Sequence, residues 1–206
     1  MKNYKNLFIS FEGPEASGKS SQIKLLSFFL KKNKIEHVIT REPGGTLIGE
    51  KLRKIILDKK KIISPVEEIL LLMAARQNHI NNIIKPALKK GKIVISDRFA
   101  DSTFVYQGYV NKFGLNKAMF LHKKILNNFL PTKTFLFLLP ANIINQRLKK
   151  RKIFNKYDMI NLKFHKSVME GYKLISKNNK RFYSINANNS INNIHLQIID
   201  KLNIVK

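Results

Sequence analysis

An eight-residue loop near the amino end, GPEASGKS at residues 13–20, restricts the possible folds more than any other stretch of the chain. The apolar run LFISF, residues 7–11, precedes it and predicts a short buried strand, and the apolar residues of SSQIKLLSFFLKK behind it repeat at helical spacing. In a strand, glycine-rich loop and helix of this order, backbone N–H groups turn toward one point where the helix dipole favours an anion. We therefore predict a binding site for nucleotide phosphates at this turn.

Two side chains of the loop predict what it binds. The amine of Lys19 can reach the outer phosphates of a nucleotide, and the hydroxyl of Ser20 can bind Mg²⁺. We therefore expect ATP and Mg²⁺ as cofactors. A glycine-rich turn without a ligand is the alternative, and the flanking strand and helix favour the nucleotide site. The expected cofactor-binding residues of the loop are Gly13, Pro14, Glu15, Ala16, Ser17, Gly18, Lys19 and Ser20.

Five apolar runs predict the strands of one sheet, at residues 7–11, 36–40, 92–96, 133–139 and 181–187. Helical patterns separate them, among them 47–58 and a long helix over 65–91 that ends at Gly91. Strands that alternate with helices imply a parallel sheet with helices on both faces. No linker rich in proline, glycine or serine divides the 206 residues. The prediction is a single α/β domain over residues 1–206 with the three-layer P-loop NTPase fold.

The segments just after these strands are the expected binding sites, because ligands of open α/β sheets bind beyond the carboxyl ends of the strands. These segments read GPEASGKS, REPGGT and DRFADSTFVYQG. In the last of them, Asp97 can orient Mg²⁺-bound water or Lys19, and Arg98 can hold a phosphoryl group; a surface ion pair is the alternative. REPGGT alone is equally explained by a plain turn.

The balance of basic residues makes arginine informative. The formal net charge of +26 by itself suggests a nucleic-acid partner. Only seven of the 39 basic residues are arginine, and the lysines are spread along the whole chain, as AT-rich codon usage would produce, so we expect no nucleic-acid partner. Lysine cannot replace the planar fork of arginine at a bidentate contact. Arg76 interrupts the apolar face LLLMAAR and needs a polar partner, which an internal salt bridge would also supply.

Residue types and hydropathy exclude several classes of protein. Without cysteine the chain has no disulfide, thiol catalyst or cysteine-bound zinc, and its five histidines lack the spacing of a transition-metal site. The start, MKNYKNLFIS, lacks the apolar core of a signal peptide, and apolar runs such as ILLLMAA at 69–75 are too short to span a bilayer. The sequence therefore predicts a cytoplasmic protein without a membrane partner.

Five longer motifs follow one another along the chain: FEGPEASGKS, TREPGGT, LLLMAARQNH, IKPALKKGKIVISDRF and DSTFVYQG. In this order and at these separations they resemble the motifs of bacterial thymidylate kinases, and the likeness continues into NLKFHKSVMEGYKLI, so it covers nearly the whole chain. Many enzymes share the first motif, whereas TREPGGT followed by D-S-x-x-x-Y-Q-G is far more selective. The resemblance implies transfer of a phosphate from ATP to dTMP, which forms dTDP for dTTP biosynthesis.

The resemblance also implies roles for individual residues. Glu15 falls where these enzymes carry an acidic residue that contacts the acceptor's 3′-hydroxyl and the metal shell. Arg76 matches the arginine that reads a thymine carbonyl, and Tyr106 matches the tyrosine whose ring crowds the 2′ position of the sugar. The expected acceptor-binding residues are Arg41, Glu42, Arg53, Leu72, Arg76, Arg98, Thr103, Tyr106 and Gln107. The expected metal-binding residues are Glu15, Ser20 and Asp97, and the catalytic ones are Glu15, Lys19, Arg98 and Arg151.

The chain departs from the family pattern at three places. Leu72 stands where an aromatic residue often stacks on thymine. Ala16 stands where some relatives carry an arginine for the transferred phosphate, and the lid, about residues 147–160, is irregular as well. Arg147 and Arg151 lie four apart and share one face of a helix, so they can bind ATP and supply the missing charge, although a solvated basic patch explains them equally. The family further implies a homodimer.

Three other functions remain open. A kinase for another nucleoside monophosphate or a deoxynucleoside would share the phosphate-binding loop, and Arg76, Thr103, Tyr106 and Gln107 argue against it. A P-loop ATPase stimulated by nucleic acid would explain the charge, but the sequence has no identifiable basic face. A non-catalytic binding protein is disfavoured because the loop keeps both its lysine and its serine.

Overall fold

A computed structural model describes residues 6–58, 60, 62–149 and 162–204 of the chain. Its strands are β1 (Phe8–Glu12), β2 (His37–Arg41), β3 (Ile93–Asp97), β4 (Lys133–Leu138) and β5 (Phe182–Asn186). Its longer helices are α1 (Lys19–Lys32), α2 (Leu47–Leu57), α3 (Pro65–His79), α6 (Leu115–Leu126), α7 (Ala141–Lys149), α8 (Leu162–Ser176) and α9 (Ile191–Leu202). The shorter ones are α4 (Lys85–Lys89), α5 (Ala100–Thr103) and the π-helical segments η1 (Ile80–Ile84) and η2 (Phe104–Val110).

The five strands form one parallel sheet, as the sequence predicts, and their order in it is β2-β3-β1-β4-β5. β1 lies at the centre, where Phe8 pairs with Val94 of β3 and Ile9 pairs with Lys133 of β4. All five residues of β1 are buried, which explains why this strand reads as a continuous apolar run rather than an alternating one. The ends of β1 and β3 therefore lie side by side at the carboxyl edge of the sheet.

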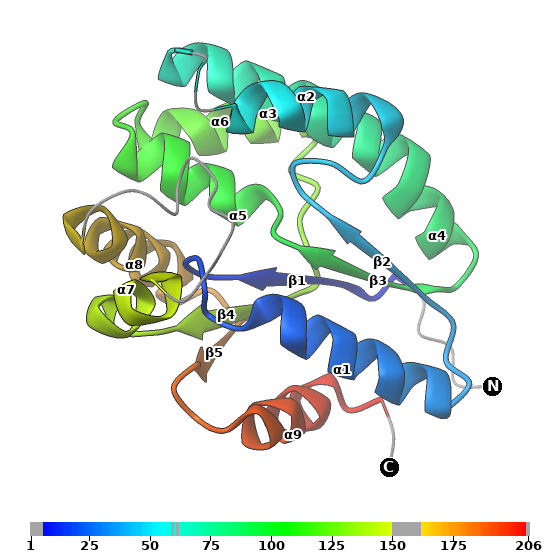
Figure 1. Ribbon diagram of the computed structural model, residues 1–206. Coiled ribbons are helices and arrows are strands. Elements are labelled where there is room, and N and C mark those ends of the chain that lie inside the picture. The colour runs from blue at the N-terminus through cyan, green and yellow to red at the C-terminus, as the bar shows by residue number, and fades with distance from the viewer. Residues whose placement is uncertain (1–5, 59, 61, 150–161, 205–206) are drawn as a thin grey trace.

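Helices cover both faces of the sheet, so the fold has the three predicted layers (Figure 1). On one face α1 and α9 pack together through apolar side chains such as Leu26 and Ile198. On the other face the helices from α3 to α6 pack around a second core that includes Met73 and Phe99. The phosphate-binding loop connects β1 to α1 at the carboxyl edge, between these two layers.

The long helix predicted over 65–91 is present with a change of pitch in its middle. Ser64 caps it: its hydroxyl accepts from the backbone N–H of Glu67, and the Glu67 carboxylate accepts from the N–H of Ser64. The π-helical segment η1 then separates α3 from α4. Pro86 in α4 has no N–H to donate to the preceding turn, and such sites favour a local widening of the helix. Gly91, in the left-handed region at φ 74°, ends it as predicted.

The lid expected at about residues 147–160 is described only in part. Residues 147–149 form the last turn of α7, and residues 150–160, Arg151 among them, lie outside the described residues. In the ranges that the structure describes, none of the helices combines the length and the apolar character needed to cross a membrane.

Candidate active site

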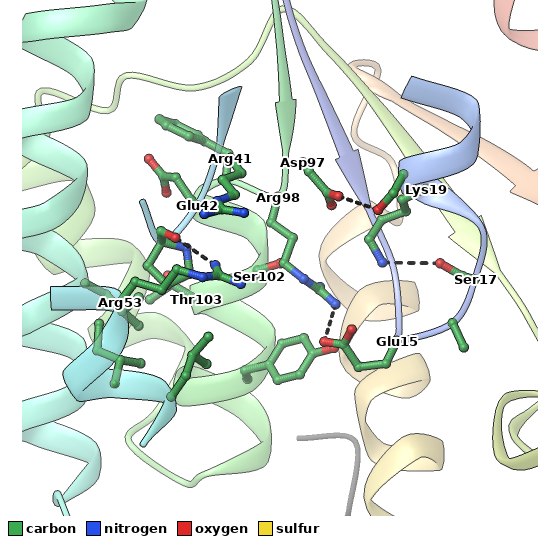
Figure 2. A pocket seen from close by; sticks show the side chains of 18 of the residues that line it. Glu15, Ser17, Lys19, Arg41, Glu42, Arg53, Asp97, Arg98, Ser102 and Thr103 are labelled. Carbon is green, nitrogen blue, oxygen red and sulfur yellow. Dashed lines mark hydrogen bonds and ion pairs between the residues drawn. The ribbon is translucent and has the colours of Figure 1, made fainter. Parts of the chain in front are cut away.

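A cleft of about 520 Å³ opens at the carboxyl edge of the sheet, above the ends of β1, β2 and β3. The phosphate-binding loop forms one end of the cleft, and α3 with the segment after β3 forms the other (Figure 2). The loop residues in its wall are Glu15, Ala16, Ser17, Gly18, Lys19 and Ser20. Gly13 and Pro14 stand behind this wall, where their carbonyl groups serve as acceptors.

The backbone of the loop requires glycine at its start. Gly13 has φ 135°, and a Cβ there would lie 2.5 Å from the carbonyl oxygen of Phe137 in β4. Glycine is thus needed both for the conformation and for the close approach to the neighbouring strand. Gly18 is left-handed as well, at φ 92°, and caps α1 with no side chain over its N–H groups. The first turn of α1 therefore keeps its N–H donors turned toward the cleft.

Lys19 folds back into the loop. Its ammonium donates to the carbonyls of Pro14 (2.7 Å) and Gly13 (3.2 Å) and to the hydroxyl of Ser17 (3.3 Å). Burial, followed by the positive charge of Arg98, lowers the pKa of Lys19 from 10.5 to about 8. A negatively charged ligand would offset both causes, so the lysine is set to respond to an anion in the loop.

A hydroxyl and a carboxylate meet beside the loop. The Ser20 hydroxyl donates to Oδ2 of Asp97, at the end of β3, over 2.9 Å. Mg²⁺ is commonly bound through one or two carboxylates together with phosphate oxygens and water. Within the described ranges no three His, Cys, Asp or Glu side chains gather into a metal cluster. The donor set therefore fits a Mg²⁺ ion that takes most of its ligands from a bound nucleotide and from water.

Arg98 holds its guanidinium between the two ends of the cleft (Figure 2). Its backbone is left-handed, at φ 69°, a conformation that costs a non-glycine residue roughly 1–2 kcal/mol. Nη2 donates to the Glu15 carboxylate over 2.6 Å, and Nη1 donates to the Gly13 carbonyl over 2.9 Å. The ring of Tyr106 lies below, 5.1 Å from the guanidinium carbon. Glu15 is thus engaged with Arg98, and the strained turn after β3 aims this arginine over the loop.

A buried carboxylate that the sequence analysis did not select supports this centre from below. Glu12, the last residue of β1, accepts from the N–H of Phe99 (2.6 Å) and from the hydroxyls of Ser102 (2.6 Å) and Tyr172 (2.9 Å). Burial, and next the charge of Asp101, raises the pKa of Glu12 to about 7. The three donors nevertheless match an ionised carboxylate, which can only accept.

Two further arginines stand at the mouth of the second end of the cleft, the end formed by α3 and the segment after β3. Arg41 pairs with Glu50 of α2 over 2.9 Å, on the exposed side. Arg53 donates from Nη1 to the carbonyl of Pro43 over 2.8 Å. Burial, and then the positive charge of Arg41, lowers the pKa of Arg53. The cations of the cleft therefore repel one another, and this part of the wall favours an anion.

Arg76 is buried, yet it lines the cleft with its partner Glu42. Nε donates to Glu42 Oε2 over 2.7 Å, and Nη2 donates to the Thr103 hydroxyl over 2.6 Å. Only 1% of Arg76 and 5% of Glu42 is exposed, so the pair is an internal salt bridge as well as part of the wall. Nη1 faces the thioether sulfur of Met73 at 3.9 Å, a weak acceptor. The guanidinium keeps donor capacity for a polar ligand at this end.

The remaining wall of this second end of the cleft is largely apolar. Leu72, Tyr106 and Gln107 line it, and Gln107 donates to Glu68 over 3.3 Å. Phe99 also contributes, with its ring 5.3 Å below the guanidinium carbon of Arg76. A flat ring with two or three polar groups at its edge fits such a slot.

Arg147, near the end of α7, lies beside the phosphate-binding loop. Nη1 donates to the carbonyl of Ala16 over 3.3 Å, and Nη2 donates to the carbonyl of Ala187 over 3.2 Å. The arginine thus stands at the position where the loop itself offers only a methyl group. It lines the cleft, in contrast to the exposed Lys149 two residues later.

Several residues of the site are not identified by the sequence motifs alone. Ser102 stands within a predicted motif, but its contact with Glu12 depends on the turn after β3. Tyr172 comes from α8, far along the chain, and only the folded sheet brings it to the centre. His79 lies three residues after Arg76, and this helical spacing could have indicated a shared partner.

Comparisons with known proteins agree with this arrangement. The model of the family described as thymidylate kinase matches residues 11–198. The thymidylate kinase of Thermoanaerobacter sp. (strain X514) is 40% identical over 198 residues, which cover 95% of this chain and 97% of that protein. Those of Clostridium novyi (strain NT) and Staphylococcus epidermidis (strain RP62A) are 37% and 41% identical, and cover 94% and 91% of this chain and 97% and 92% of their own lengths. A match of this extent establishes that the chain belongs to the thymidylate kinase family.

Proposed function

We propose that this enzyme transfers the γ-phosphoryl group of ATP to the phosphate of dTMP, with ADP and dTDP as products. One observation carries the proposal beyond family membership: a single cleft joins the phosphate-binding loop to the pocket of Arg76, with Arg98 between them. In the reaction an oxygen of the acceptor phosphate forms a bond to the γ-phosphorus, and the bond from that phosphorus to the oxygen bridging to the β-phosphate breaks. Such a transfer mainly requires two aligned nucleotides and positive charge at the moving group.

The end of the cleft formed by the phosphate-binding loop, the donor end, binds the phosphates of ATP. The N–H groups of the loop and of the first turn of α1 face the β- and γ-phosphates, and the Lys19 ammonium leaves its carbonyl acceptors for them. Ser20 and Asp97 hold Mg²⁺, which neutralises phosphate charge when it is bound. Arg147 lies over the loop from the lid side and contributes to binding ATP.

The end of the cleft formed by α3 and the segment after β3, the acceptor end, binds dTMP. Arg41 and Arg53 face its phosphate, because they are the cations at the mouth of this end. Arg76 donates to a carbonyl of thymine beside Thr103, and the ring of Tyr106 closes the space at the sugar. Leu72 provides an apolar surface for the base in place of an aromatic ring.

Arg98 lies where the two phosphates meet, and it completes the proposed catalytic group with Lys19. Its guanidinium is fixed by Glu15 and the Gly13 carbonyl before any ligand arrives, so no reorganisation is needed during the transfer. A dianionic acceptor phosphate needs no dedicated base, and none of the described residues is assigned that role.

The experiment that tests this function is a coupled assay of ADP release with ATP, Mg²⁺ and one acceptor at a time: dTMP, dUMP, UMP, dCMP, AMP or GMP. We expect dTMP to be the best acceptor, dUMP to be weaker, and UMP to be poor because its 2′-hydroxyl meets Tyr106. A best rate with dCMP, AMP or GMP would assign the cleft to another nucleotide. ATP hydrolysis that proceeds without an acceptor and is stimulated by DNA or RNA would instead support the ATPase alternative.

The proposal extends to the assembly and the place of action. We propose a homodimer, because α2 and α3 expose apolar side chains that a second copy could cover, among them Leu47, Ile48, Val66 and Leu70. Sedimentation that gives a monomer throughout the micromolar range would contradict it. We also propose that residues 1–206 act as one domain with a lid at about 147–160, and that the enzyme works in the cytoplasm, where ATP is available.

A further inference from the structure

The thymidylate-kinase-like motif LLLMAARQNH contains a histidine for which the proposed function has no role. His79, the last residue of α3, is fully buried, and both of its ring nitrogens have partners. Nδ1 lies 3.0 Å from Oε1 of Glu42, and Nε2 lies 2.6 Å from the hydroxyl of Thr40. A buried ring with two such short contacts is held in one orientation.

The partners also fix where the proton of the ring resides. A carboxylate accepts hydrogen bonds and cannot donate them, so Nδ1 of His79 carries the hydrogen and donates to Glu42. In the neutral ring Nε2 is then the acceptor, and the hydroxyl of Thr40 donates to it. The result is a directed chain of hydrogen bonds from Thr40 in β2 through His79 in α3 to Glu42 in the loop after β2.

Glu42 is the link between this histidine and the cleft. One of its oxygens accepts from His79 and the other from Arg76, so the carboxylate cannot turn without losing a hydrogen bond. Arg76 and His79 stand three apart and therefore share one face of α3. Thr103 fixes the far side of the Arg76 guanidinium. The plane of this guanidinium thus depends on where His79 holds Glu42.

The same ring supports the glycine pair of REPGGT. A Cβ on Gly45 would lie 2.5 Å from the hydroxyl of Thr40 and 2.8 Å from Nε2 of His79. Gly45 also has φ 80°, which favours glycine. The loop backbone therefore rests directly on the histidine, so the ring connects the loop that carries Glu42 with the helix that carries Arg76.

We propose that His79 is a positioning residue for recognition of the acceptor base: by donating to Glu42 it sets the guanidinium plane of Arg76 that meets thymine. The inference rests on the proposed function, because it assumes that Arg76 contacts the acceptor. His79 itself touches no substrate in this scheme. Its removal therefore weakens dTMP binding and leaves ATP binding nearly unchanged.

Three substitutions separate positioning from simple packing. In His79→Asn the amide nitrogen occupies about the position of Nδ1 and can still donate to Glu42. In His79→Gln the amide reaches toward Thr40 and leaves Glu42 without its donor, and His79→Leu fills the space with no donor at all. We expect the KM for dTMP to rise about tenfold to a hundredfold in the Gln and Leu variants, as for a lost hydrogen bond to a charged group. In the Asn variant it should stay within about threefold of the wild type, because the donor is kept.

The control is His122→Leu, which removes a second fully buried histidine, from α6 and outside the cleft wall. It should lower the melting temperature without changing the ratio of the KM values for dTMP and ATP. Equal dTMP KM values in the Asn and Leu variants, or KM values for dTMP and ATP that rise together, would overturn the inference. So would unfolding of every His79 variant, because that outcome assigns the ring to core stability alone. Failure of the wild type to use dTMP would instead overturn the proposed function.

Discussion

The buried pair of Arg76 and Glu42 yields a prediction that separates stability from recognition. In Arg76→Met the side chain keeps most of its length but loses its charge, and Glu42 Oε2 loses its donor. Burial alone would raise the pKa of Glu42, but Arg76 and then His79 outweigh it and lower the pKa below 4.5. Glu42 thus contributes stability above pH 4.5 that is lost as the pH falls through its folded pKa. The substitution removes the main cause of that contribution.

The size of the effect follows from the burial of both partners. Because 1% of Arg76 and 5% of Glu42 is exposed, water cannot replace the lost partner. Removing one member of such a pair costs about 3–5 kcal/mol of the free energy of unfolding. For a domain of 150–250 residues this corresponds to a drop in melting temperature of roughly 6–20 °C. Removing both charges in Arg76→Met/Glu42→Gln should restore most of the stability, because no buried charge is then left unpaired.

The assay combines urea unfolding at pH 7 with the KM for dTMP and for ATP. Both the single and the double variant should lose recognition of dTMP, whereas only the single one should be strongly destabilised. The deficit of the single variant should also shrink toward pH 4, where the unpaired Glu42 can take up a proton. A single variant that loses less than about 1 kcal/mol, or a double variant that is no more stable than the single one, would refute the reasoning. A double variant that keeps the wild-type KM for dTMP would refute the role of Arg76.

Further predictions concern the donor end of the cleft. The affinity for ATP should fall about tenfold between pH 7 and pH 9, because Lys19 has a pKa of about 8 in the free protein and loses its charge above it. Calorimetric titration of ATP into the wild type and Lys19→Met at both pH values tests this. An equal pH dependence in the two proteins would contradict it. The same lowered pKa affects stability. Between about pH 8 and pH 10.5 the unfolded chain keeps the proton of Lys19 and the folded chain loses it, so the free energy of unfolding increases as the pH rises through this range. Arg147→Ala should lower turnover about tenfold, as for lost charge stabilisation, whereas the exposed Lys149→Ala should be nearly silent; equal rates in the two variants would place Arg147 outside the reaction.

Most of the fold could be predicted because each strand is a short apolar run bounded by polar or turn residues. The strands differ from their predicted ranges by about a residue at each end, as for the run at 133–139, which forms β4 over Lys133–Leu138. The π-helical segment within the long helix could not be predicted, because its period differs little from that of an α-helix over a single turn. Its cause involves the backbone around Pro86 rather than the apolar pattern.

The loops of the site could be predicted for a different reason: their residues follow strands, and parallel strands end at one edge. The buried residues that support these loops could not be predicted. Glu12 reads as the polar end of an apolar run, and its partner Tyr172 is 160 residues away. His79 has no metal-ligand spacing in the sequence, and its shared partner with Arg76 becomes visible only in the fold. A buried polar residue becomes recognisable when its partners are known, and those partners depend on the three-dimensional fold.

The mutual repulsion of cations in the cleft has a practical consequence for handling the protein. Burial, and next the positive charge of a neighbouring arginine, lowers the pKa values of Lys19 and Arg53, so both cations are held at a cost in free energy when no anion is bound. A small polyanion that binds in the cleft would relieve this repulsion, and preferential binding to the folded chain would stabilise it by mass action. Sulfate or phosphate in a purification buffer would therefore protect the enzyme and at the same time compete with both nucleotides. Kinetic constants measured in phosphate and in a buffer without polyanions would therefore describe the enzyme with and without an anion in its cleft.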